Sequence, residues 1–99
     1  MTGNPLDIIK ESDSELFDLI GQSDELSFTE KGIPLQYKFL IAMALDASEG
    51  AENGVRNLAT QAINAGATKE EVMQAVRIAN YISGIGSVYT AANALKDIV

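Results

Sequence analysis

Residues 35–48 read LQYKFLIAMALDAS and residues 65–82 read AGATKEEVMQAVRIANYI, and these two stretches decide the fold. The first predicts a helix with almost no polar stripe, and a helix of that kind is buried on most of its sides. In the second, Thr68 and Glu71 have the spacing of a capping box, in which each side chain bonds the backbone N–H of the other residue. A helix therefore follows from about 69 to 82.

The segments around these two also have helical patterns. A helix over about 51–65 is predicted between Gly50 and Gly66, because glycine readily takes the left-handed conformation that ends helices. A last helix, over about 87–97, follows the turn Gly84-Ile85-Gly86. That turn lacks the third glycine of a nucleotide-binding loop and follows a helix, so a tight helix–helix turn is the better interpretation.

The N-terminal third predicts one helix and a connection. Asn4 is expected to cap a helix whose first residue is Pro5. That helix runs to about Ile20 and is ended by Gly21, and residues 21–34 form the connection. The whole pattern gives five helices and no strand, so the predicted fold class is all-α.

Length and composition limit the possible functions. The 99 residues allow one domain, and 46% of them are hydrophobic, which predicts surface covered by partner subunits. The net charge of −7 disfavours nucleic acid and anionic membranes as partners. No run approaches the ~18 apolar residues of a membrane span, and the N-terminus has no signal region. We therefore expect a cytoplasmic protein.

The chain contains neither cysteine nor histidine. Disulfides, thiolate nucleophiles and cysteine-ligated metals are thereby excluded. The commonest general base and the commonest transition-metal ligand are missing as well. We expect neither a metal nor a cofactor.

Residues 35–95 resemble the carboxymuconolactone decarboxylase and alkylhydroperoxidase D superfamily. The motif A-G-A-T-x-E-E of that family is present at 65–71, and its ending A-x-N-A-L is present at 91–95. The resemblance implies an antiparallel helical bundle that assembles as a ring, often a trimer or hexamer. It also implies a pocket between subunits near residues 49–54. The chain then forms a single domain over 1–99, with an N-terminal helix and connection in 1–34 and the family core in 35–99.

The positions that carry reactive side chains in the family hold apolar residues or glycine here, and we call them the emptied positions. Counting back from the motif at 65–71, the family histidine falls on Leu58 and the two cysteines on Gly54 and Ala51, while the glutamate of K-E-L-I falls on Phe39. The resemblance thus leaves no catalytic residue in place. We expect Phe39 and Leu58 to lie mostly buried in packed core where the family has a wet pocket.

Three charged residues remain beside this segment. Glu49 and Glu52 are candidates for a general base, although a solvated acidic edge explains them as well. Arg56 could hold an anionic ligand by bidentate hydrogen bonds, or form an ion pair with Glu52 one helical turn earlier. Tyr81 and Tyr89 flank the glycine turn, where the family lines its pocket, and could donate to a bound carbonyl. Packing at a core or an interface is the alternative for both tyrosines.

Three functions compete. A thiol-dependent peroxidase needs a low-pKa thiolate, which this chain lacks. A cofactor-free lactone decarboxylase, a lyase, would need a base other than histidine. The favoured interpretation is a catalytically degenerate member of the family that acts as a scaffold or as a small-molecule-binding homo-oligomer.

Overall fold

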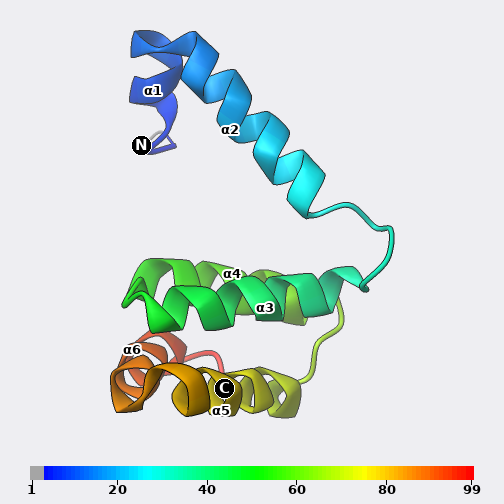
Figure 1. Cartoon of the computed structure of the whole chain (residues 1–99), viewed down its shortest axis with the longest axis vertical. Helices are drawn as coiled ribbons and strands as arrows, with labels where there is room; N and C mark the ends of the chain where they lie inside the picture. The colour runs from blue at the N-terminus through cyan, green and yellow to red at the C-terminus, as the bar shows by residue number, and fades with distance from the viewer. Residues whose placement is uncertain (1–3) are drawn as a thin grey trace.

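The computed structural model describes residues 4–99, which form six helices and no strand (Figure 1). The predicted all-α class is confirmed. The helices are α1 (Asp7–Ser12), α2 (Ser14–Ser27), α3 (Leu35–Ser48), α4 (Glu52–Asn64), α5 (Lys69–Ser83) and α6 (Ile85–Leu95).

Helices α3 to α6 form the core, with α3 and α4 in one layer over α5 and α6 in the other (Figure 1). Met43, Val55 and Val72 are the largest fully buried side chains, one from each of α3, α4 and α5. Most of the other buried core residues are alanines: Ala47, Ala59, Ala62, Ala67, Ala79, Ala91 and Ala94. Small side chains in the core let the helix backbones approach closely. Many of the larger apolar residues lie on the surface instead.

The local signals of the sequence set most boundaries in the core. α3 spans 35–48 as predicted, and both bonds of the capping box form, at 3.0 Å to the N–H of Glu71 and 2.9 Å to that of Thr68. Gly50 and Gly66 have φ of 75° and 114°, as predicted for residues that end helices. Gly84 alone separates α5 from α6, with φ of 87°, so α6 begins at Ile85 and not at 87.

The prediction for the N-terminal third was wrong in three respects. The single helix predicted from Pro5 to about Ile20 is two helices, because Asp13 leaves helical geometry and its side chain caps α2 by accepting from the N–H of Leu16. Gly21 lies inside α2, where glycine costs only about 1 kcal/mol and does not stop a helix whose apolar spacing continues. Asn4 accepts a bond from the N–H of Leu6, but the helix begins only at Asp7.

Helices α1 and α2, here called the N-terminal arm (residues 7–27), stand away from the core. They pack against each other and make no contact with α3 to α6 (Figure 1). The radius of gyration is 14.5 Å, whereas a compact domain of this length has about 13 Å. The arm, which stands away from the core, accounts for the larger radius of gyration.

The connection over 28–34 is tied to the start of α3. The Lys38 ammonium donates to the backbone oxygens of Thr29, at 2.6 Å, and Lys31, at 2.9 Å. The rings of Phe28 and Phe39 stack with centroids 5.0 Å apart. These contacts fix where the arm leaves the core. Within residues 4–99, no helix has both the length and the apolar character that crossing a bilayer requires.

Candidate functional site

The four family positions are spread along α3 and α4: Ala51 and Gly54 lie at the junction of the two helices, Leu58 lies in the middle of α4, and Phe39 lies near the start of α3. Phe39 and Leu58 are half-buried and pack against the core. Burial is therefore less complete than expected, and Phe39 owes part of its cover to the stacked ring of Phe28. Neither residue lines the hollows described below. Apolar side chains packed on the core therefore stand at the two positions where the family has its glutamate and its histidine.

Gly54 allows a close approach between α3 and α4. A side chain at this position would run into the Asp46 carboxyl group on α3. Ala51, at the other cysteine position, is half-buried just before α4. The loss of a side chain at Gly54 is thus part of how these two helices pack.

The two candidate bases, Glu49 and Glu52, are exposed at the end of α3 and the start of α4. No hydrogen bond or ion pair joins their side chains to another described residue, and neither lines the hollows described below. The interpretation as a solvated acidic edge fits this placement.

Arg56 does not pair with Glu52, which corrects the predicted partner. Its Nη1 donates to the backbone oxygen of Ala94 at 3.1 Å, and its Nη2 lies 3.9 Å from Oδ2 of Asp97. The last carbonyls of a helix are unpaired and carry partial negative charge, which attracts a guanidinium. Arg56 therefore joins α4 to the end of α6.

Tyr81 and Tyr89 project outward on either side of Gly84, and both are strongly exposed. The α3–α4 and α5–α6 junctions lie at the same end of the core (Figure 1). The fold thus brings both tyrosines to the end that holds Glu49 and Glu52, but no bond links the four side chains within residues 4–99. They do not form a site within one chain.

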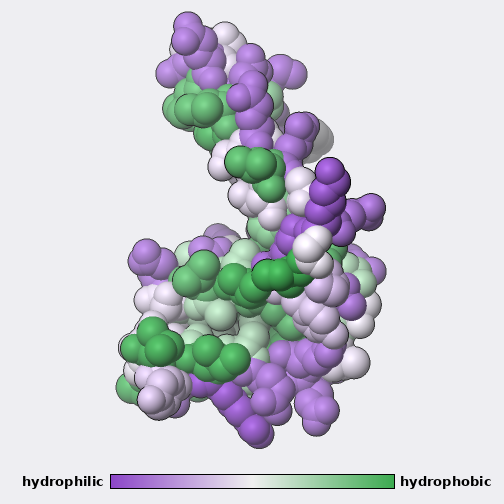
Figure 2. All heavy atoms as spheres, turned by 45° about the vertical axis from the view of Figure 1, so that its right-hand side comes forward, coloured by the Kyte–Doolittle hydropathy of each residue, from purple (hydrophilic) through white to green (hydrophobic). Residues whose placement is uncertain are grey.

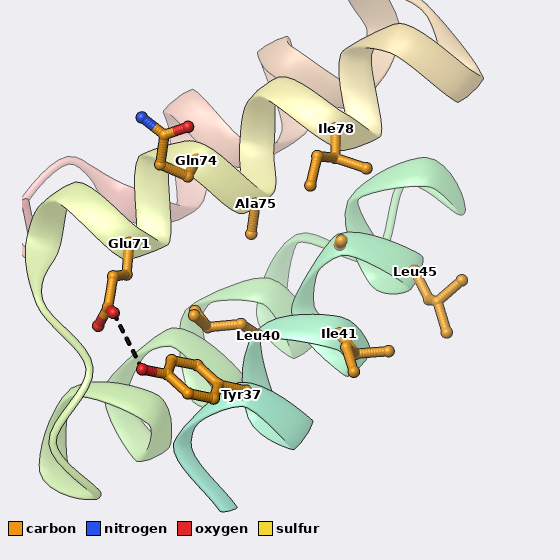
Figure 3. Close-up of a pocket in the computed structure, with 9 residues that line it drawn as sticks. Tyr37, Leu40, Ile41, Leu45, Glu71, Gln74, Ala75 and Ile78 are labelled. Carbon is orange, nitrogen blue, oxygen red and sulfur yellow. Dashed lines mark hydrogen bonds between the residues drawn. The ribbon is translucent and has the colours of Figure 1, made fainter. Parts of the chain in front are cut away.

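A hollow of about 460 Å³ lies elsewhere, in a groove between α3 and α5. We call it the α3–α5 groove (Figure 3). Its lining residues are Tyr37, Leu40, Ile41, Ala44, Leu45, Glu71, Gln74, Ala75 and Ile78. The side chains are mainly apolar, and one end has a polar pair in which the hydroxyl of Tyr37 donates to Oε2 of Glu71 at 3.2 Å. The other oxygen of Glu71 accepts from the N–H of Thr68.

A second hollow, of about 400 Å³, lies between the connection and the other side of α3. Ile41 and Leu45 line both hollows. Helix α3 thus presents a continuous apolar ridge with a depression on each side.

Comparison with known families agrees with this architecture. Residues 14–97 match the model of the carboxymuconolactone decarboxylase family. The chain belongs to that family. Among curated proteins, none matches the chain. The match begins with α2 and ends just beyond α6, so the second helix of the arm lies inside the family region.

Sequence reasoning missed the groove in this family member. Tyr37, Ile41 and Leu45 follow one another at a spacing of four, which is a signal for one face of a helix. The contact with Glu71, 34 positions away, has no local signal beyond the capping box in which that glutamate takes part.

The polar pair of the groove predicts a shifted tyrosine titration. The Glu71 carboxylate raises the pKa of Tyr37, chiefly through its negative charge and then by accepting the phenol's hydrogen bond. The bond contributes its full stability below pH of about 10, and this contribution is lost as the pH rises through the raised pKa.

We expect Glu71→Gln to return one of the three tyrosines toward its ordinary pKa in a spectrophotometric titration. Glutamine also serves in a capping box, so the helix start should persist. The control is Glu70→Gln, which removes a charge that Tyr37 does not contact. An equal shift in both variants would contradict the assignment.

Proposed function

We propose that this member of the carboxymuconolactone decarboxylase family is a catalytically silent homo-oligomer that serves as a scaffold. One observation carries the proposal: many large apolar side chains lie outside a core in which alanine is the commonest residue. The strongly exposed residues Leu45, Ile78, Tyr81, Ile82, Ile85 and Tyr89 are between 62% and 86% exposed.

Leu45 and Ile78 line the α3–α5 groove, one from each helix. Hydrophobic side chains cluster on the face formed by α3 and α5 (Figure 2). The chain exposes 6863 Å² in total, against about 5,500 Å² for a compact monomer of this mass, and the arm that stands away from the core contributes to this excess of about 1,400 Å² of polar and apolar surface. Apolar patches beyond a few hundred Å² mark interaction surfaces. A second copy is the simplest cover for them.

Catalytic silence rests on the emptied positions. With Leu58 and Phe39 in place of a histidine and a glutamate, the two positions at which the family carries proton-accepting side chains are apolar here. The alternative is a lactone-decarboxylase-like lyase that uses a carboxylate base. One observation favours it, since Glu71 is the carboxylate that lines the α3–α5 groove. Both of its oxygens already accept hydrogen bonds, which leaves it poorly placed to take a further proton.

Light scattering of the full chain tests the assembly. We expect a mass of three or six times 10.6 kDa, because closed rings of identical subunits cover every copy of the apolar face. A mass of 10.6 kDa at micromolar concentration would refute the proposed scaffold.

An assay of peroxide reduction tests the proposed absence of thiol-dependent peroxidase activity. Without a thiolate, the purified chain should not reduce hydroperoxides, and adding a dithiol should make no difference. The control is the same dithiol without protein. Turnover above that background would show chemistry that the emptied positions do not explain.

A further inference from the structure

We propose that the N-terminal arm of one copy lies in the α3–α5 groove of a second copy. This inference rests on the proposed homo-oligomer and names the segment that covers its apolar face. Both surfaces are present in every chain, so each copy can give an arm and receive one.

The arm needs a surface that its own chain does not supply. None of the residues in α1 or α2 is buried, and helices this short are marginal in water unless an apolar face packs on something. Leu16, Leu19, Ile20 and Leu26 lie on one face of α2, at the spacing of a helix that fits into a groove. They are between 36% and 80% exposed.

The arm is held away from the groove of its own core. Lys38 bonds two backbone oxygens of the connection, and Phe28 stacks on Phe39, which together set the direction in which α2 leaves. Figure 1 shows α2 rising away from α3 along its whole length. The partner that fits is therefore the arm of another copy.

The area is sufficient for such an interface. Each chain exposes about 1,400 Å² more than a compact monomer of its mass, and a stable interface of standard size buries about 800 Å² on each partner. The groove and the second hollow share Ile41 and Leu45 on the α3 ridge, so an α2 helix laid along the groove would contact apolar side chains of that ridge.

Charge favours an arm on a core over an arm on an arm. Residues 1–34 hold eight acidic and two basic residues, a net −6, while residues 35–99 hold six and five, a net −1, which together give the −7 of the chain. Two arms side by side would repel each other. Arg77, next to the groove residue Ile78, is exposed and has no ion pair within residues 4–99, so it can face the arm's carboxylates.

Cross-linking between two single-cysteine variants tests the proposal, because the chain has no cysteine of its own. Full-length Leu19→Cys protein is mixed with full-length Ile78→Cys protein, dissociated, reassembled and oxidised. We expect a covalent dimer in the mixture and little in either protein alone. The matched control replaces Leu19→Cys with Asp18→Cys, which lies on the polar side of α2 and should not cross-link to position 78.

Light scattering on the same samples separates the two proposals. An oligomer without the cross-link between positions 19 and 78 would overturn the placement of the arm and leave the scaffold standing. A monomer would overturn both. Equal cross-linking from Asp18→Cys, or a strong covalent dimer of Leu19→Cys alone, would also overturn the placement, since the second result means that arms pair with arms.

Discussion

A chain carrying both Ile41→Glu and Leu45→Glu should run as a 10.6 kDa monomer in light scattering. Both residues lie on the α3 ridge that lines the two hollows. Covering the ridge would force two carboxylates out of water without partners, and the effective penalty is several kcal/mol for each ion. This free-energy penalty exceeds the stabilisation that one interface of this size provides.

The folded core should survive the same change. Ile41 is 49% exposed and Leu45 is 62% exposed, so glutamate at either position stays in water within one chain. The matched control is Asn57→Glu with Gln61→Glu, which adds the same charge at the same spacing on the exposed side of α4. A double variant at 41 and 45 that keeps the mass of the parent chain would show that α3 is not an interface.

Met43→Ala should be the most damaging single truncation in the core. Met43 is fully buried between the helix layers, and removing a buried side chain of this size costs about 2–5 kcal/mol in transfer and cavity terms. The measurement is denaturant unfolding at one fixed protein concentration, because the stability of an oligomer depends on concentration.

Met73→Ala is the matched control for that truncation. The same atoms are removed from a side chain that is 42% exposed on α5, so the loss should be well below that at Met43. Similar losses at the two positions would mean that the partner subunit covers Met73 as fully as the core covers Met43.

The parts of the fold that sequence could predict are those with local signals. The capping box of Thr68 and Glu71 and the glycines at 50 and 66 set helix ends through bonds between near neighbours. The break at Asp13 was equally local but was overlooked, because the apolar spacing on both sides of it fits one long helix. The prediction that Gly21 ends a helix was wrong because a glycine inside a helix weakens the helix without ending it.

The candidate site was less predictable, because its contacts join distant positions. Arg56 reaches the end of α6, about 40 residues along the chain, and Tyr37 reaches Glu71 across the groove. Neither pairing follows from spacing along one helix. The resemblance to the family identified the emptied positions but did not reveal that an open apolar groove lies on another face of α3.

The contact at Gly54 constrains the order in which substitutions could rebuild a catalytic motif. A cysteine placed there would meet the Asp46 carboxyl group, so the thiol could enter only after Asp46 had moved aside or been replaced by a smaller residue. Recovery of the family's chemistry from this chain therefore requires the Asp46 side chain on α3 to rearrange as well as the reactive residues to return.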